Sequence, residues 1–501
     1  MSTLKKFAGQ TAIYGISTVI SRFLNFVLTP IYVGVYPAKV FGILTTLYAW
    51  TSILNAVLAF GMETTFFRFL SKYNHSKKIY SNTFFTIAGV TVVFAILSFS
   101  NANSIAAWMQ NKNTASLEDY KLFVRFFIGI LCVDAFAVIP FAKLRADGRP
   151  IKYGIIKLIN ILCFVGLNLF FLFVVPWVIK QQGPLSGAFA QWFKPGWIGY
   201  VFVSNLLASA LTLLLLLPEL LELTFDIDFK IIIEMLSYSF PVLVANLSFI
   251  INENSDKLFL EKLLPGRIST MEVGIYGACC KIAIFLSIFI QAFRLGAEPF
   301  FFSYSKNTNA RETYARIMNY FIIVIALIFV GLVANIEILK YFIRGHDEHQ
   351  RMLYWSGLRV VPILLFGYVS LGIYMNLSIW YKLSDQTRYG LYISGIGAIL
   401  TIILNILFIP RYSYMASAWV SLIAYFTMMV LSYMLGQKHY PIPYDLKKAS
   451  LYLILAVLIV TVSFSIFHRN IIIGNVLFVL FAGFAFYQER AELLAMFRKR
   501  N

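Results

Sequence analysis

Residues 248–260, SFIINENSDKLFL, place five polar or charged side chains within six positions of an otherwise apolar segment. They are Asn252, Glu253, Asn254, Asp256 and Lys257. Glu253 and Lys257 are four residues apart, in the order that favours an ion pair on one helix face. Carboxylate, ammonium and amide groups can bind phosphates, sugars or small cations, and carboxylates can take up protons. An apolar segment tolerates such groups where they face water, a ligand or one another.

Ionisable side chains also interrupt other apolar segments, and each costs about 2.5–3.5 kcal/mol near the centre of a bilayer. They gather on five predicted helices, which favours a single hydrated cavity. Structural ion pairs, such as Arg294 with Glu298, and long side chains that reach the membrane surface are the alternative interpretation. The candidate cavity residues are Ser21, Arg22, Asn25, Glu63, Arg125, Asp134, Glu253, Lys257, Lys281, Gln291, Arg294 and Glu298.

The elements that must position these residues are membrane spans. Of 501 residues, 59% are hydrophobic and 13% are charged, and the mean hydropathy is +0.76. This composition is typical of an all-α polytopic membrane protein, because helices satisfy their own backbone hydrogen bonds in lipid. We expect fourteen spans, at 7–33, 41–67, 81–100, 121–142, 153–178, 196–218, 231–260, 272–300, 317–341, 357–381, 388–409, 413–435, 449–467 and 471–488.

The net charge of +19 reflects basic residues in short loops rather than a nucleic-acid-binding patch. Lys and Arg are concentrated in 72–78, in 143–152 and at the end of the chain, which predicts that both termini are cytoplasmic. The first apolar run is too long for the core of a signal peptide, so we expect it to be a retained span.

The sequence gives little support to an enzyme or a metal protein. No large loop, HExxH, P-loop or nucleophile elbow is present. The HDEHQ segment (346–350) has two histidines but no further ligand nearby, so we interpret it as a solvated loop. The four cysteines lie in apolar runs without CxxC spacing, which predicts neither a disulfide framework nor a zinc site.

An internal repeat suggests two related halves. Gly42-Ile43 opens a run that ends in ETTFFRFLSK (63–72), and Gly274-Ile275 opens one that ends in EPFFFSYSK (298–306). We therefore expect an N-terminal lobe of six helices at 1–225 and a C-terminal lobe of six at 226–440, related by a pseudo-two-fold axis. Residues 441–501 would add two helices and a basic cytoplasmic tail. Transporters with such repeats hold substrate between their halves.

An ordered set of segments resembles the MOP exporter superfamily, specifically the bacterial polysaccharide flippases that handle O-antigen or capsule repeat units. The segments are ISRFLNFVLTPI (20–31), DAFAVIPFAKLRADGRP (134–150), FPVLVANLSFIINENSDKLFL (240–260), VGIYGACCKIA (273–283), and NLSIWYKLSDQT (376–387) through LNILFIPRYSYMASAW (404–419). The resemblance implies a MATE-like fold in the inner membrane. It also implies alternating-access transport of an undecaprenyl-diphosphate-type oligosaccharide for lipopolysaccharide or other surface polysaccharide.

The resemblance also carries over individual residues. Ser21 and Arg22 match a Ser-Arg pair of the lipid II flippases, but Leu28 stands where those proteins have a second arginine. The usual glycine-rich turn after helix 11 is replaced by residues 412–416. Positions that bind sodium in some relatives match Asp256, Thr401, Asn405 and Ser421, with one carboxylate where the relative has two.

We expect no cofactor or bound metal beyond H⁺ or Na⁺ as the coupling ion. Glu253 or Asp256 is the candidate proton carrier, because burial raises the pKa of a carboxyl group. The expected partners are the lipid-linked oligosaccharide, membrane lipids and other polysaccharide-assembly proteins. Nucleic acid is not expected.

Other function classes compete with the flippase. A MATE-type drug or cation antiporter would need an acidic cavity, which Arg22, Lys281 and Arg294 oppose. A lipid II flippase is disfavoured at Leu28. A glycan-building membrane enzyme would need a catalytic external loop, and a receptor or scaffold is the remaining class.

Arg22 generates the first prediction, because, of the candidate charges, it is expected nearest the centre of the bilayer, and it has no opposite charge within its own helix. Arg22→Ala should leave membrane insertion intact yet abolish surface glycan in a complementation assay. Normal glycan in a strain that carries only this variant would remove Arg22 from the mechanism.

Overall fold

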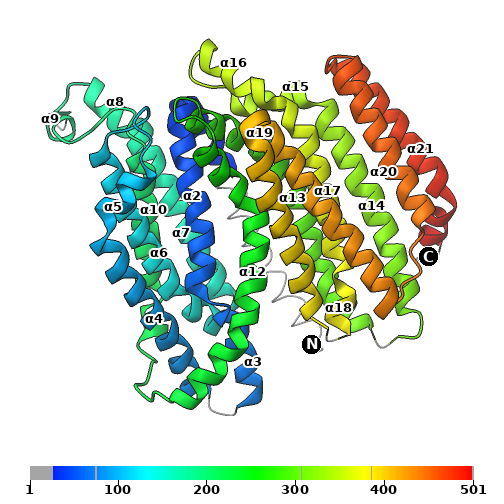
Figure 1. Cartoon of the computed structure of the whole chain (residues 1–501), viewed down its shortest axis with the longest axis horizontal. Helices are drawn as coiled ribbons and strands as arrows, with labels where there is room; N and C mark the ends of the chain where they lie inside the picture. Colours follow the sequence, from blue (N-terminus) through cyan, green and yellow to red (C-terminus); the bar gives the residue numbers. More distant parts are fainter. Residues whose placement is uncertain (1–25, 74–75, 185, 306, 385, 499–501) are drawn as a thin grey trace. The chain divides into compact units, whose positions relative to one another are not determined.

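The computed structural model describes residues 26–73, 76–184, 186–305, 307–384 and 386–498, which fold into helices without a β-strand (Figure 1). In this part of the chain, 11 helical segments are long and apolar enough to cross a membrane. Phe26–Val35 and Gly199–Leu215 are shorter apolar helices. The predicted all-α polytopic class is therefore confirmed. The count of fourteen spans stays a prediction, because 11 candidates are found among the described residues and windows 388–409 and 413–435 fall in one assigned range that is broken at Ser413.

The chain forms two compact units. The first runs through Gly277 and includes Gly345–Leu353 and Ser394–Ser417; the second comprises Ala278–Arg344, Tyr354–Ile393 and the chain from Ala418 onward. Three helices, α13, α16 and α19, contribute residues to both units. The predicted lobes, 1–225 and 226–440, were defined by the sequence repeat, whereas these units are defined by contacts within the fold. The lobes therefore stay a prediction.

The first unit is built mainly from the N-terminal helices. They are Phe26–Val35, α2 (Ala38–Ala59), α3 (Met62–Lys72), α4 (Ser76–Ser100), α5 (Ala102–Met109), α6 (Leu117–Ala146), α7 (Pro150–Leu169), a π turn (Phe170–Val174), α8 (Val175–Lys180), α9 (Ser186–Ala190), α10 (Gly199–Leu215), α11 (Leu217–Leu220), α12 (Phe229–Leu263) and the start of α13 (Ser269–Tyr304).

Helix α6 is central to this unit, since α2, α4, α5, α7 and α10 all pack against it (Figure 1). The Ser116 side chain caps its N-terminus by accepting a hydrogen bond from the backbone N–H of Asp119. Apolar residues of α2, α3, α4, α6 and α12 meet in one core, which includes Phe66, Phe69, Leu131 and Met235. The core fixes the helices that carry Glu63, Asp134 and Asp256.

Helices α2 and α13 approach each other closely through paired glycines. A Cβ added to Gly42 would lie 1.8 Å from the carbonyl oxygen of Thr270, and one added to Gly274 would lie 1.9 Å from that of Ala38. Gly42 and Gly274 are 232 positions apart, as are Ala38 and Thr270. The contact is therefore reciprocal, and it joins the two Gly-Ile markers of the sequence repeat.

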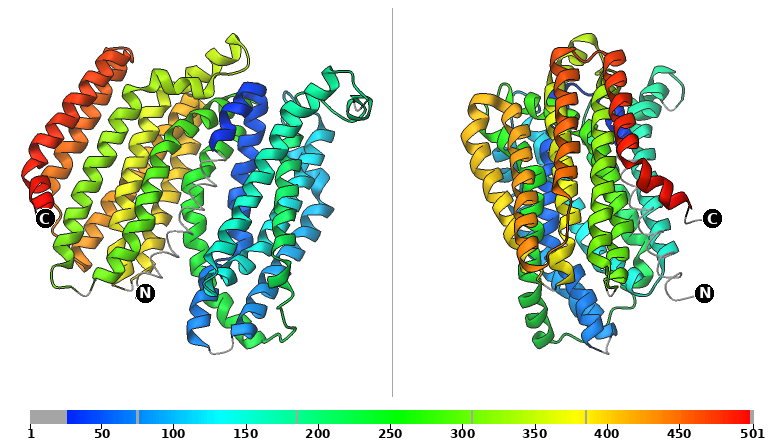
Figure 2. Two further views of the ribbon diagram at one scale, coloured as in Figure 1. Left: turned by 180° about the vertical axis from the view of Figure 1, so that it is seen from behind. Right: turned by 90° about the vertical axis from the view of Figure 1, so that its right-hand side faces the viewer.

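The second unit contains the helices that follow Gly277, apart from the portions of α16 and α19 that belong to the first unit. They are the rest of α13, α14 (Ala310–Ala334), α15 (Ile336–Leu339), the 3₁₀ turns Lys340–Ile343 and Gly357–Val360, α16 (Glu348–Ser356), α17 (Val361–Leu377), α18 (Ile379–Leu383), α19 (Arg388–His439), α20 (Leu446–Thr461), a π turn (Val462–Ile466) and α21 (Ile471–Arg498). The two C-terminal helices α20 and α21 pack against α14 (Figure 2).

The range labelled α19 comprises two helices that meet at a break in the backbone. It runs for 52 residues, and Ser413 breaks its geometry with φ 49° and ψ −140°. Pro410 lacks the N–H that a regular helix would use, which weakens the helix just before the break. A positive φ is strained for serine, and the Ser413 hydroxyl donates a hydrogen bond to the carboxylate of Glu272. The break between the two helices thus falls within residues 412–416, the segment that replaces the usual glycine-rich turn.

The basic segment 143–152 is held by acidic residues that precede α12. Lys143 pairs with Glu222, and Lys152 pairs with the buried carboxylate of Glu219 at 2.5 Å. The hydrogen bond from Lys143 holds the pKa of Glu222 below its ordinary value. These basic side chains therefore have a structural role in addition to the topological role expected from the sequence.

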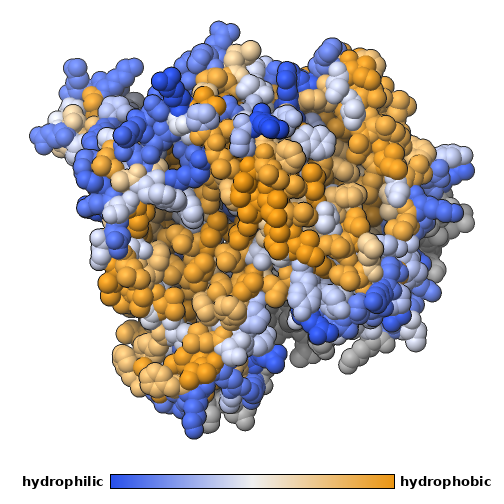
Figure 3. Space-filling model, viewed as in Figure 1, coloured by the Kyte–Doolittle hydropathy of each residue, from blue (hydrophilic) through white to orange (hydrophobic). Residues whose placement is uncertain are grey.

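Exposed apolar side chains line one face of the first part of α19. Ile396, Ile399, Ile403 and Leu407 are three or four residues apart and all are exposed. Figure 3 shows the hydrophobic surface over this helix. Such a surface is costly in water and suits contact with lipid.

The glycine crossing generates a stability prediction. Gly274→Ala should destabilise the protein by about 1–3 kcal/mol, because its Cβ meets the Ala38 backbone. Thermal unfolding of the purified protein in detergent measures this. Gly89→Ala is the matched control, since nothing lies within 4 Å of that added Cβ. An equal melting temperature for both variants would contradict the close crossing.

Candidate functional site

The predicted site residues are divided between the two units. Ser21, Arg22 and Asn25 lie outside the described residues. The first unit holds Glu63, Arg125, Asp134, Glu253, Asp256, Lys257, Thr401 and Asn405, and the second holds Lys281, Gln291, Arg294, Glu298 and Ser421. A single chamber for all of them stays a prediction.

Asp134 of α6 lies among polar groups from two neighbouring helices. Its carboxylate accepts a hydrogen bond from Ser209 of α10, and it interacts electrostatically with Lys157 of α7. The Lys157 ammonium also lies 4.3 Å from the centre of the Phe141 ring. Asp134 therefore has a positive charge and a hydroxyl donor within the packed helices.

Glu63 and Arg125 have more open surroundings. Glu63, in the first turn of α3, forms an ion pair with Arg145 at the end of α6, and about two-fifths of each side chain is exposed. The Glu63 charge also acts on Lys157. Arg125 is exposed on α6. Glu63 and Asp134 thus both interact electrostatically with Lys157.

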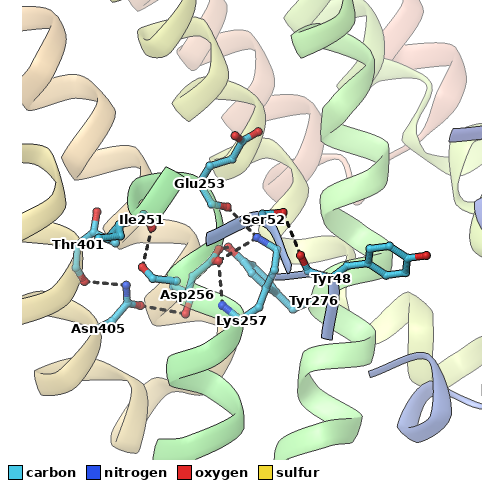
Figure 4. Close-up of polar contacts among 11 residues, drawn as sticks. Tyr48, Ser52, Ile251, Glu253, Asp256, Lys257, Tyr276, Thr401 and Asn405 are labelled. Atoms are coloured by element: carbon cyan, nitrogen blue, oxygen red, sulfur yellow. Dashed lines mark hydrogen bonds and ion pairs between the residues drawn. The ribbon is translucent and has the colours of Figure 1, made fainter. Parts of the chain in front are cut away.

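Asp256 and Lys257 form a compact ion pair on α12 (Figure 4). The Lys257 ammonium lies 2.9 Å from Asp256 Oδ1, and it donates a second hydrogen bond of 2.8 Å to the backbone carbonyl of Glu253. Tyr276 of α13 donates a 2.7 Å hydrogen bond to Asp256 Oδ2. The Glu253 carboxylate points away from this pair in Figure 4. Lys257 therefore pairs with its chain neighbour rather than with the predicted Glu253 carboxylate.

Thr401 and Asn405 of α19 belong to a second polar network that also includes α12. Thr401 donates a 2.9 Å hydrogen bond to Asn252 Oδ1, and Asn252 donates to the backbone carbonyl of Ser394. Asn405 donates to the carbonyl of Thr401 and accepts a 3.1 Å hydrogen bond from Ser417. This network ties α12 to α19 within the first unit. Ser421 is buried and belongs to the second unit.

Arg294 and Glu298 line a small pocket in the second unit, formed by α13, α14, α17 and α18. Glu298 pairs at 2.7 Å with Lys382 of α18 instead of with Arg294. The guanidinium of Arg294 makes no ion pair among the described residues, and it lies 4.0 Å from Met375 Sδ. The pocket therefore carries one positive charge in excess.

Asn376 adds an unsatisfied donor to the same pocket. Its side chain is 8% exposed, and within the described part of the chain Nδ2 has no hydrogen-bond acceptor. Leaving such a donor unpaired costs about 1–3 kcal/mol, so a ligand that accepts from it gains affinity. Phe293, Phe301 and Phe321 provide apolar walls.

Lys281 and Gln291 lie on α13, and both are partly buried and engaged in contacts. Gln291 donates a 3.2 Å hydrogen bond to Ser287, one turn earlier. Among the described residues, no three His, Cys, Asp or Glu side chains gather as a metal centre would require.

Four polar residues that complete these clusters were not among those predicted from the sequence: Lys157, Tyr276, Asn376 and Lys382. Tyr276, Asn376 and Lys382 were present in segments quoted for the family resemblance, but their partners lie on other helices. Helical spacing detects neighbours within one helix only. Lys157 falls within an apolar span and could have been added to the intramembrane charges by inspection.

A family model described as "Polysaccharide biosynthesis protein" matches residues 7–305. The chain belongs to this family. A second model, MatE, matches residues 241–407, and no curated protein matches the sequence. The predicted membership of the MOP superfamily is confirmed.

Solved structures show how far the fold is shared. This chain aligns with the lipid II flippase MurJ in an inward closed conformation, with a TM-score of 0.72 and 13% sequence identity. The alignment covers 95% of this chain and 99% of the MurJ chain. This chain also aligns with an inward-facing multidrug resistance MATE transporter of the MOP superfamily at 0.63 and 12% identity, covering 88% and 98%. A MOP transporter from Pyrococcus furiosus aligns at 0.56 and 14%, covering 86% and 95%. The chain therefore has the fold of these transporters, as predicted, and is a multi-pass membrane protein.

The Asp134–Lys157 contact generates a prediction about stability. Lys157→Met should destabilise the protein by on the order of 3 kcal/mol, because it leaves the Asp134 carboxylate without its positive partner. Asp134→Leu in the same chain should recover most of that loss. A double-mutant cycle of melting temperatures measures the coupling, and additive effects would show that the two charges act independently.

Proposed function

We propose that the protein is a flippase that moves a lipid-linked oligosaccharide of the undecaprenyl-diphosphate type across the bacterial inner membrane by alternating access. The product would serve surface polysaccharide synthesis, such as O-antigen for lipopolysaccharide. The family description "Polysaccharide biosynthesis protein" and the fold shared with a lipid II flippase support this choice.

The observation that carries the proposal is the pocket of Arg294, Glu298, Asn376 and Lys382. A diphosphate needs cations and hydrogen-bond donors, and charged donors bind phosphate oxygens most strongly. Arg294 supplies a guanidinium without an ion pair among the described residues, and Asn376 supplies an amide without an acceptor there. The aromatic walls suit the apolar faces of sugars.

Ligand entry requires the pocket to open. Its free volume of about 20 Å³ holds little more than one water molecule. The Lys382–Glu298 pair at 2.7 Å lies at its lining, and Lys382 could exchange Glu298 for a phosphate oxygen. An anion would thus be favoured in a conformation where this pair separates. Such differential binding is what a transport cycle needs to shift between states.

The other predicted residues complete the proposal. Ser21, Arg22, Asn25, Glu63, Arg125, Asp134, Glu253, Lys257, Lys281 and Gln291 would contact the cargo head or balance its charge. The repeat-defined lobes would alternate, with both termini in the cytoplasm. Other polysaccharide-assembly proteins would supply and use the cargo.

A MATE-type antiporter is the second candidate, favoured by the MatE match to residues 241–407. An organic cation would prefer a negative pocket, whereas this one has a positive excess. A lipid II flippase is disfavoured, because Leu28 stands where those proteins have their second helix-1 arginine. Leu28 is uncharged and only 1% exposed.

Proteoliposomes loaded with a polyprenyl-diphosphate-linked oligosaccharide test the function. The wild-type protein should move the lipid between leaflets, and Arg294→Gln should slow the movement about 10–100-fold. That range corresponds to losing a charged hydrogen bond worth about 1.5–3 kcal/mol. Arg316→Gln is the matched control, since Arg316 is an exposed arginine of α14 in the same unit.

Export of ethidium by the same vesicles without movement of the glycolipid would favour the antiporter. Equal rates for Arg294→Gln and Arg316→Gln would exclude the pocket as the diphosphate site.

A further inference from the structure

Asp256 is a carboxylate that must be neutralised. It lies on α12, whose 35 residues include a membrane span, and it is 3% exposed. An ionised carboxylate buried without a counter-charge is very unfavourable. The positive charge can come from a bound cation, from a proton or from the chain itself.

The chain supplies its own cation. The Lys257 ammonium lies 2.9 Å from Asp256 Oδ1, 2.8 Å from the Glu253 carbonyl oxygen and 5.9 Å from the centre of the Tyr276 ring. These are a carboxylate oxygen, a carbonyl oxygen and an aromatic face. Small hard cations take carboxylate and carbonyl oxygens as ligands. The ammonium therefore fills the position that such an ion would occupy.

The surrounding groups hold this arrangement in place. Asp256 Oδ2 accepts from the Tyr276 hydroxyl at 2.7 Å, and Oδ1 also accepts from the backbone N–H of Lys257 at 2.8 Å. Neighbouring residues on a helix do not normally face each other, so the Lys257 side chain must fold back to reach Asp256. The Lys257 side chain is 14% exposed, which limits exchange of its ammonium for an ion from solution.

We propose that the Lys257 ammonium is a tethered counter-cation that makes the Asp256 site independent of sodium, and that removing it creates a site for a small monovalent cation. A tethered ammonium has a very high effective concentration and is not lost when the protein changes conformation. The consequence for transport, that flipping needs no sodium gradient, rests on the proposed function. The binding claim does not, so stability rather than flipping tests it.

The experiment compares melting temperatures of the purified full-length protein in NaCl and in choline chloride at equal ionic strength. Wild-type protein and Lys257→Arg should melt at the same temperature in both salts. Lys257→Met should be destabilised in choline and should gain about 3 °C or more in NaCl, because a cation that binds only the folded state stabilises it. Lys257→Gln should show the same sodium response. It replaces Lys257→Met in the experiment if Lys257→Met does not fold.

A rise in the wild-type melting temperature with sodium would overturn the proposal. So would the absence of a sodium response in both Lys257→Met and Lys257→Gln, since the carboxylate would then be neutralised by a proton. The double variant Asp256→Asn, Lys257→Met should lose the response. If it retains the response, sodium binds elsewhere and the assignment to Asp256 fails.

Discussion

Charge compensation within apolar helices is the constraint that organises this protein. An ionised group in a low-dielectric interior costs several kcal/mol unless an opposite charge and hydrogen bonds accompany it. Asp256 forms an ion pair with Lys257 on its own helix, and Glu298 forms one with Lys382 on α18. Asp134 interacts electrostatically with Lys157 on the next helix. Each of these three acids thus has a cation beside it, whereas the Arg294 guanidinium makes no ion pair among the described residues.

The packing of small residues supports the same arrangement. The α2–α13 crossing at Gly42 and Gly274 brings the start of α13 onto α2, and Gly277 lies against Thr45 in the same contact. Tyr276 lies between Gly274 and Gly277 in the sequence, and its hydroxyl donates a hydrogen bond to Asp256. The glycine contact therefore sets the position of a side chain in the ion-pair cluster. Backbone packing and charge compensation are linked on this face of α13.

The sequence predicted the helices well because long apolar runs have few other ways to satisfy their backbone. The repeat of Gly42-Ile43 and Gly274-Ile275 also marked residues that the fold brings together. Partner choice was harder, because spacing along one helix suggested Glu253–Lys257 and Arg294–Glu298, whereas the structure pairs Lys257 with Asp256 and Glu298 with Lys382. Those choices depend on side-chain rotamers and on neighbouring helices, which periodicity does not encode. The sequence also predicted a boundary between windows 388–409 and 413–435, but not that the break would be the single backbone distortion at Ser413.

The reciprocal glycine contact also has a consequence for biogenesis. Gly42 and Gly274 are 232 positions apart, so their crossing cannot form until more than half of the chain has been synthesised. Until then, Ala38 and Gly42 of α2 lack their contact with α13, although chains generally fold from the N-terminus as they emerge. The early helices must therefore persist in the bilayer in an incomplete arrangement. The contact of α13 with α2 is therefore added after those helices have been made.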